Sequence, residues 1–286
     1  METIVIAGVG LIGGSFGLAL RRAGFSGRIV GVSSPPTIQT AIRRGAIDEG
    51  APLAEAVAQA DLVLLAQPIS VILQVLPEVA ARLKPGALVT DAGSTKRAIV
   101  EEAEKHFPPG AFLGGHPMAG KAERGVGVAE AGLFEGRPWI LTPVRREDEE
   151  TERARWLQAW IGALGARLMV LTPVQHDRVV AAASHLPQLA SSALAALLDD
   201  SPESALARAA AGPGLHDMTR LALSDAGLWR DICATNQEEI RRLLREYAAR
   251  LSGLADQFEP ASLDALFRSA NRFASQLRNS ASDRKK

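Results

Sequence analysis

A glycine-rich turn near the N-terminus is the first stretch whose residue types and spacing could do chemistry. It follows the β-branched run Ile4–Ile6 and precedes apolar residues at helical spacing. Its residues are Gly8, Val9, Gly10, Leu11, Ile12 and Gly13. We expect Gly8 to permit a tight turn, Gly10 to let the backbone approach a pyrophosphate, and Gly13 to let the helix lie close on the strand. Because the N–H groups and dipole of a helix N-terminus favour negative charge, the turn predicts a dinucleotide site. A purely structural glycine turn is the alternative.

A serine and a histidine follow two later strand-like runs. Ser94 lies in the segment DAGSTK after the run Ala87–Thr90, and His116 lies between glycines and a proline after Phe112–Gly115. Open α/β sheets bind ligands beyond the carboxyl ends of their strands, so we expect both side chains at that edge. A neutral imidazole, with an ordinary pKa of about 6.5, is a suitable proton acceptor near neutral pH. Taken alone, Ser94 is by default an ordinary turn residue.

The end of the second strand-like run bears on the choice of cofactor. Arg28–Val32 is followed by Ser33 and Ser34, where dinucleotide-binding folds commonly carry an Asp or Glu for the ribose hydroxyls. No carboxylate follows before Asp48. Nothing there repels a 2′-phosphate, which favours tolerance of NADP, although serines are also common in ordinary turns. Both NAD and NADP therefore remain open.

The elements that must position these residues change character near residue 172. Up to there, strand and helix patterns alternate, and Leu62–Ala66 is typical of a parallel strand buried on both faces. From 173 onward the pattern is helical, with a kink expected at Ser184–Pro187 and long helices over 229–254 and 261–277. We predict an α/β Rossmann-type domain over 1–172 and an all-α domain over 173–286, with a disordered tail from about residue 279. The broad apolar helix faces favour contact with a second subunit.

Composition excludes several other classes of protein. The chain has 286 residues, 47% hydrophobic, with 32 basic and 32 acidic side chains. A zero net charge does not favour nucleic acid or an anionic membrane as a partner. The single cysteine, Cys233, can form no internal disulfide, so a reducing cytoplasm is the simplest location. No apolar run approaches the roughly 18 residues that cross a membrane.

The histidines do not form a metal-binding pattern. His176 and His185 are nine residues apart, a spacing that suits no chelating pair on one helical face. We therefore predict no metal site, and we expect His185 to order the kinked helix.

Five segments taken together resemble the prephenate/arogenate dehydrogenase family. They are the glycine turn, DAGSTK (91–96), GGHPMAG (114–120), HDRVVAAASHLP (176–187) and DMTRLALSDAGLWRDI (217–232). The similarity covers nearly the whole chain in the same order. It implies a 6-phosphogluconate-dehydrogenase-like architecture and a homodimer formed through the helical domain. It also implies NAD(P)-dependent oxidative decarboxylation, from prephenate to 4-hydroxyphenylpyruvate or from arogenate to tyrosine, in tyrosine biosynthesis.

The resemblance also implies roles for individual residues. His116 matches the catalytic histidine of the family, and Ser94 matches its partner serine. The substrate-binding positions that it implies are Arg220, Ser184, Gln188, Lys121 and Trp229. Arg220 suits a substrate carboxylate because a guanidinium binds it with two parallel hydrogen bonds. Gln188 stands where the family commonly has a histidine, which leaves prephenate or arogenate open, and Lys121 lies at a variable position.

Two other interpretations remain. A β-hydroxyacid dehydrogenase or an imine or pyrroline carboxylate reductase would share the glycine turn and the helical domain. We expect such enzymes to lack GGHPMAG and the TR…WRDI pair. A non-catalytic NAD(P) sensor would bind the cofactor without turnover.

Overall fold

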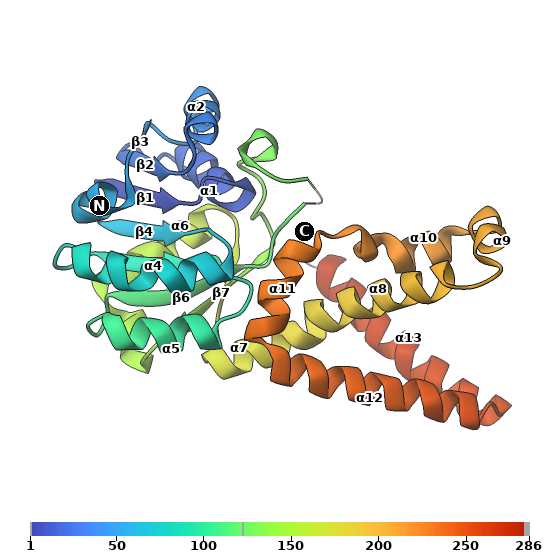
Figure 1. The fold of residues 1–286 in the computed structure, drawn as a ribbon. Helices are drawn as coiled ribbons and strands as arrows, with labels where there is room; N and C mark the ends of the chain where they lie inside the picture. Colours follow the sequence, from blue (N-terminus) through green and yellow to red (C-terminus); the bar gives the residue numbers. More distant parts are fainter. Residues whose placement is uncertain (1, 122, 283–286) are drawn as a thin grey trace. The chain divides into compact units, whose positions relative to one another are not determined.

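The computed structural model describes residues 2–121 and 123–282. The chain divides into two compact units, Met1–Gln237 and Glu238–Lys286. The sheet and the helices up to α11 belong to the first unit, and α12 and α13 form the second (Figure 1). The boundary at residue 172 separates the alternating part of the chain from the helical part, and as a domain boundary it remains a prediction.

One sheet runs through the first unit, and the described residues supply it with strands in the order β3-β2-β1-β4-β5-β6-β7-β8. The strands are β1 (Thr3–Ala7), β2 (Arg28–Val32), β3 (Glu49–Gly50), β4 (Leu62–Leu65), β5 (Leu88–Asp91), β6 (Phe112–Pro117), β7 (Pro138–Pro143) and β8 (Arg167–Val170). Neighbouring strands are parallel except β6 and β7, which are antiparallel. The carboxyl ends of β1, β4, β5 and β6 therefore meet at one edge, as the sequence predicts.

Helices cover both faces of the sheet. They are α1 (Leu11–Arg22), α2 (Pro35–Arg43), α3 (Leu53–Gln59), α4 (Ile69–Arg82), α5 (Arg97–His106) and α6 (Glu152–Ala163). In Figure 1, α4 and α5 lie side by side in front of the sheet and α6 lies behind it. Phe16 of α1 and Leu157 of α6 join Ile6 in one buried cluster on that rear face. Each fully buried side chain of this size contributes about 1.5–3 kcal/mol, so the cluster fixes α1 against β1.

The helical part of the first unit follows β8. It comprises α7 (Pro173–Val180), a π-helical turn (Ala181–His185), α8 (Leu186–Asp199), α9 (Ser204–Ala209), α10 (Pro213–Thr219), a 3₁₀ turn (Arg220–Leu223) and α11 (Ala226–Thr235). The interruption predicted near Pro187 is confirmed, because the π-helical turn ends directly before α8. Pro187 has no N–H to donate to the preceding turn, so the regular helical hydrogen-bond pattern is interrupted there.

The helix predicted over 229–254 is wrong as a single element. The structure ends α11 at Thr235 and starts α12 (Gln237–Asp256) after Asn236, whose φ of −126° leaves the helical region. The buried Asn236 side chain donates to the Asp177 carbonyl, which holds the chain at this break. The last helix, α13 (Pro260–Ser282), continues past residue 279, and the remainder of the predicted tail, 283–286, lies outside the described residues.

One helical stretch has the length and composition of a membrane span. It is Pro173–Asp199, with a mean hydropathy of 1.2 over its most apolar window. The prediction from sequence considered only uninterrupted apolar runs and missed this stretch, because its few polar residues break the run but leave the mean hydropathy high. His176 and Asp177 in this stretch hydrogen-bond to the sheet-containing part of the chain, which is the arrangement of a structural helix in a globular unit.

Candidate active site

The glycine turn has the geometry that its sequence predicts. Gly8 has φ +96°, and a Cβ there would lie 2.5 Å from the Ala66 carbonyl oxygen. A Cβ on Gly13 would lie 2.2 Å from the Gly8 carbonyl oxygen, so only glycine lets α1 approach the strand this closely. A Cβ on Gly10 would meet no described heavy atom within 4 Å, because Gly10 faces open space at the N-terminus of α1.

A cleft of about 580 Å³ opens in front of that helix end. Gly10, Leu11 and Ile12 line it together with segments that follow β4 and β5. The buried Val9, like Gly8 and Gly13, is absent from its described lining and shapes the turn from behind. The cleft size falls within the range of small-molecule and cofactor sites. Its position at the strand ends fits a nucleotide, with the pyrophosphate beside the α1 N-terminus.

Ser33 and Ser34 lie outside the described lining of this cleft and are exposed. The Ser34 hydroxyl lies 2.9 Å from the Thr37 hydroxyl, next to the start of α2. The first downstream carboxylate, Asp48, accepts from the Ile29 N–H at 2.7 Å and pairs with Arg21. That carboxylate is therefore engaged in structural contacts.

Ser94 and His116 lie where this cleft meets a second one. Both side chains line the first cleft, and both also line a second cavity of about 550 Å³. The second cavity is walled by residues of the π-helical turn and α11, among them Ser184 and Trp229. The Ser94 hydroxyl makes no hydrogen bond to another described residue, so it is available to a ligand. A molecule in the second cavity can contact the same two side chains as a molecule in the first.

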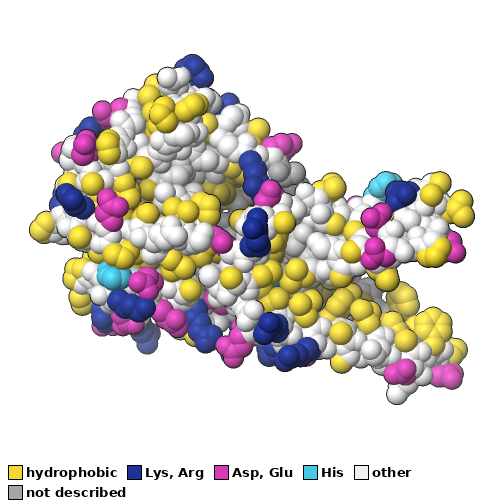
Figure 2. Space-filling model, viewed as in Figure 1, with side chains coloured by type: hydrophobic (Ala, Val, Ile, Leu, Met, Phe, Trp, Pro, Cys, Tyr) yellow, Lys and Arg dark blue, Asp and Glu magenta, His cyan; other side chains and the backbone are white. Residues whose placement is uncertain are grey.

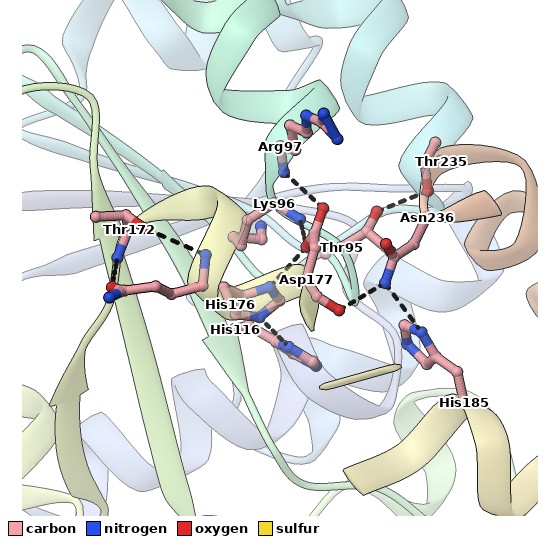
Figure 3. A network of polar contacts seen from close by, with 12 residues as sticks. Thr95, Lys96, Arg97, His116, Thr172, His176, Asp177, His185, Thr235 and Asn236 are labelled. Carbon is pink, nitrogen blue, oxygen red and sulfur yellow. Dashed lines mark hydrogen bonds and ion pairs between the residues drawn. The ribbon is translucent and has the colours of Figure 1, made fainter. Parts of the chain in front are cut away.

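His116 is tied to the interior by a chain of hydrogen bonds (Figure 3). Its Nδ1 lies 2.8 Å from Nε2 of His176, whose Nδ1 lies 2.8 Å from Oδ1 of Asp177. Asp177 also accepts the backbone N–H groups of Lys96 and Arg97 at the start of α5. A carboxylate accepts only, so neutral His176 must place its proton on Nδ1 and accept at Nε2. His116 must then donate from Nδ1, which leaves Nε2 as its free acceptor.

Burial keeps these imidazoles uncharged at neutral pH. Burial, followed by the nearby His176, holds the pKa of His116 well below its ordinary value of 6.5. Burial also lowers the pKa of His176, although its Asp177 partner acts in the opposite direction. Burial lowers the pKa of His185 to about 4. His116 is therefore an unprotonated acceptor throughout the neutral range.

A buried ion pair supports the strand that carries His116. Lys96 and Asp91 are fully buried and in contact, and burial lowers the pKa of the Lys96 ammonium while Asp91 counteracts that effect. Asp91 also accepts the N–H groups of Gly93 and Gly115. Because Asp91 hydrogen-bonds both to Gly93, in the segment that carries Ser94, and to Gly115 of β6, it fixes the spacing between Ser94 and the strand that carries His116.

The predicted substrate-binding residues fall into two groups. Ser184 and Trp229 line the second cavity beside His116, and the buried Nε1–H of Trp229 has no partner among the described residues. Lys121 lines the first cleft and pairs with Glu130 at 2.7 Å.

The other two lie apart from His116. Gln188 is buried, donates to the Leu221 carbonyl and accepts from the Ser224 hydroxyl. Arg220 is exposed and lines a different surface depression, together with His216 and Asp217. The first unit of one chain therefore brings Ser94, His116, Ser184 and Trp229 together, without Arg220 and Gln188.

Sequence reasoning missed the residues behind the histidine. It considers His176 only as a possible metal ligand and rejects that role, and it assigns no role to Asp177 or Lys96. The adjacent pair His-Asp in α7, the helix after β8, was the available signal, since a carboxylate next to an imidazole can set its tautomer. Within residues 2–121 and 123–282, no group of three or more His, Cys, Asp or Glu side chains is arranged to hold a metal ion.

Comparisons with known proteins agree with this geometry. Residues 16–170 match the family described as "Prephenate dehydrogenase, nucleotide-binding domain", and residues 172–272 match "Prephenate dehydrogenase, dimerization domain". The chain is 36% identical to the prephenate dehydrogenase of Lactococcus lactis subsp. cremoris over 89% of its own length and 71% of that protein. It is 33% identical to the Bacillus subtilis prephenate dehydrogenase over 93% of its own length and 73% of that protein.

Solved structures show the same relationship. The prephenate dehydrogenase from Aquifex aeolicus, in complex with hydroxyphenyl propionate and NAD+, matches with a TM-score of 0.87 and 32% identity over 98% of both chains. The Synechocystis arogenate dehydrogenase matches with a TM-score of 0.82 and 32% identity, over 96% of this chain and 100% of that chain. The fold predicted from sequence, a Rossmann-type domain followed by a helical one, is thus confirmed. The chain belongs to the prephenate dehydrogenase family, as its sequence motifs predict.

Proposed function

We propose that the protein oxidatively decarboxylates prephenate or arogenate with NAD(P)⁺. The observation that carries this proposal is that Ser94 and His116 line both the nucleotide cleft and the second cavity. A substrate in the second cavity then meets a proton acceptor on the wall that faces the nucleotide. Bound NAD(P)⁺ supplies the hydride acceptor, and its pyrophosphate is held by the glycine turn at Gly10, Leu11 and Ile12.

His116 takes the proton of the substrate hydroxyl at Nε2. As the ring carbon that bears this hydroxyl loses hydride, its oxygen becomes a carbonyl and then the phenol of the product. The bond to the ring carboxylate breaks, its electron pair enters the ring, and carbon dioxide leaves. The electrons displaced from the carbonyl give a phenolate oxygen, which takes back the proton held by His116. The hydrogen bond from His116 Nδ1 to His176 keeps Nε2 unprotonated and fixes the imidazole plane.

The other walls of the cavity orient the substrate. Ser94 can share the reacting oxygen with His116, and the unpartnered Nε1–H of Trp229 and the Ser184 hydroxyl offer polar contacts to the rest of the ligand. We retain Arg220, Gln188 and Lys121 as proposed substrate-binding residues. Arg220→Gln is expected to raise KM for substrate with little change in kcat, and an unchanged KM would remove Arg220 from the site.

We further propose that 1–172 and 173–286 are the functional domains and that the helical one forms a homodimer. The dimerization-domain match over 172–272 supports this, as do exposed apolar side chains of the second unit. Figure 2 shows hydrophobic side chains gathered over the part of the molecule that α12 and α13 form. Among them are Leu251, Phe258, Phe267, Phe273 and Leu277, which are 49–70% exposed. We also infer a soluble, cytoplasmic protein.

The first test is the initial rate of nicotinamide reduction with prephenate or arogenate, each paired with NAD⁺ or NADP⁺. Activity in any combination supports the proposed reaction and identifies both the preferred substrate and the preferred cofactor. Silence in all combinations from folded, cofactor-binding protein would instead favour a sensor or another dehydrogenase. His116→Asn is expected to bind cofactor normally and to lower kcat by about 10²–10⁴-fold. Turnover within a few-fold of wild type would place the base elsewhere.

A further inference from the structure

The second cavity has an unusual charge balance. Its described lining contains no carboxylate. The two histidines in that lining, His116 and His185, are both buried and have pKa values below their ordinary 6.5. At neutral pH the one remaining formal charge on this described lining is the guanidinium of Arg137. The cavity wall is therefore net positive, which suits an anionic ligand.

The backbone holds Arg137 close to the catalytic strand end. Arg137 directly precedes β7, which runs antiparallel to β6 with Trp139 opposite Pro117. The Pro138 carbonyl accepts the Met118 N–H at 2.8 Å, two residues after His116. The Arg137 carbonyl accepts the Arg167 N–H at 2.8 Å, and its own N–H donates to the Phe134 carbonyl at 3.0 Å. The N–H and the carbonyl of Arg137 are thus both hydrogen-bonded, which fixes the backbone from which its side chain extends beside the cavity.

The side chain of Arg137, by contrast, has no hydrogen-bond or ion-pair partner among the described residues. Neighbouring charges do have partners: Glu135 pairs with Arg22 at 2.7 Å, and Arg167 donates from Nε to the Gly136 carbonyl. In the first cleft, the cations Lys121 and Arg124 are already paired, with Glu130 and Asp225 respectively. Arg137 therefore offers its whole guanidinium fork to a ligand.

We propose that Arg137 is a substrate-binding residue that holds one carboxylate of the substrate; this rests on the reaction proposed above. When the substrate hydroxyl lies at His116, the ring carbon para to that hydroxyl carries both acidic groups of prephenate: the ring carboxylate directly, and the second carboxylate at the end of the side chain. The substrate presents two carboxylates, so Arg137 and Arg220 need not compete for the same group. A planar guanidinium binds a carboxylate through two parallel hydrogen bonds, which orients the ring as well as anchoring it.

The test compares wild type, Arg137→Gln and Arg137→Lys with the matched control Arg167→Gln. Arg167 is adjacent in the sheet but is absent from the described lining of the cavity. Calorimetric Kd values are measured for prephenate and for hydroxyphenyl propionate without oxidised cofactor, and KM and kcat are measured separately. Hydroxyphenyl propionate carries only a side-chain carboxylate. Loss of the bidentate contact is expected to weaken binding by about 10- to 100-fold in Arg137→Gln and by less in Arg137→Lys. The Kd of NADH and the affinities of Arg167→Gln should stay at wild-type values.

Each outcome decides the proposal. Weaker binding of both ligands assigns Arg137 to the side-chain carboxylate, and weaker binding of prephenate alone assigns it to the ring carboxylate. Wild-type affinity of Arg137→Gln for both ligands, or an equal loss in Arg167→Gln, overturns it. If wild type binds prephenate but does not turn it over, the proposed reaction fails while the Kd comparison still decides the role of Arg137. If wild type binds neither ligand, the same Kd comparison is made with arogenate, and both proposals fail if wild type does not bind arogenate either.

Discussion

The hydrogen bond from His116 to His176 allows a sharp test of how His116, the proposed base, is held in its reactive form. His176→Phe retains a buried planar ring but removes both hydrogen bonds of the imidazole. Asp177 keeps its bonds to the backbone N–H groups of Lys96 and Arg97, so its carboxylate remains partnered. The main loss is the acceptor that holds the proton of His116 on Nδ1. We therefore expect a slower enzyme that still folds and binds NADH.

The magnitude follows from the interaction that is lost. A neutral hydrogen bond contributes about 0.5–1.5 kcal/mol net, and about 1.4 kcal/mol corresponds to tenfold in rate. Freedom of the ring to rotate and to change tautomer adds to this loss, so kcat should fall by about 10- to 100-fold. That is less than the effect of removing His116 itself. KM for substrate should change little, because His176 lies behind the base and is fully buried.

The pH profile separates a positioning role from a merely structural one. A base works unprotonated, so kcat/KM falls as the pH drops through its pKa. In wild type the pKa of His116 lies well below 6.5, and His176 is the second cause of that shift after burial. Removing His176 should therefore move the acid limb of kcat/KM upward, toward pH 6.5.

Two further variants complete this test. His176→Gln, whose carbonyl can accept from Nδ1, should recover part of kcat. His106→Phe makes the same substitution at an exposed position of α5 and is the matched control; its kcat and acid limb should equal those of wild type. Unchanged kcat and an unchanged acid limb in a folded His176→Phe protein would refute the reasoning.

Three other predictions concern folding and the cofactor turn. Gly13→Ala places a Cβ 2.2 Å from the Gly8 carbonyl oxygen. Thermal unfolding should show a loss of about 1–3 kcal/mol in stability, and fluorescence titration with NADH should show weaker cofactor binding. A wild-type Tm would contradict the packing argument. The pKa of His185 in the fold is about 4, so between pH 6.5 and pH 4 only the unfolded chain takes up a proton at this residue. The free energy of unfolding, measured in urea, should therefore fall by up to about 3 kcal/mol in this range, and His185→Gln should lack this part of the loss. The same pH dependence of stability in wild type and in His185→Gln would count against this. Lys96→Met leaves Asp91 charged, buried and unpaired, which should cost about 3–5 kcal/mol in urea unfolding, and adding Asp91→Asn should restore part of it; no recovery would show that the ion pair is not the cause.

Local chemistry explains which elements the sequence predicts well. The strands from β4 to β7 each contain a short apolar run that ends at Gly, Pro or a polar residue, so the apolar run and the turn residues locate them directly. The short β3 and the break at Asn236 depend on tertiary hydrogen bonds and leave no local pattern. The glycine turn is similarly local, because the close contacts that require Gly8 and Gly13 come from the same strand–turn–helix unit or from the residues after β4.

The site shows the same division. Ser94 and His116 follow strands, so the sheet brings them together by a general rule of α/β folds. The relay through His176 and Asp177 comes from a different part of the chain, 60 residues beyond His116 in the case of His176. Arg137 meets the site only because β7 runs antiparallel to β6. Long-range pairing of this kind cannot be read from spacing in a single sequence.

Asp177 makes the chemistry of the base conditional on assembly of the chain. Its carboxylate accepts the backbone N–H groups at the start of α5, while the same carboxylate orients His176. In a chain that has formed the glycine turn but has not yet docked α7, His116 lacks the partner that places its proton on Nδ1. The glycine turn and the orientation of His116 are thus supplied by different segments of the polypeptide. Only the completed unit presents both, together with the α11 residues that line the same cleft.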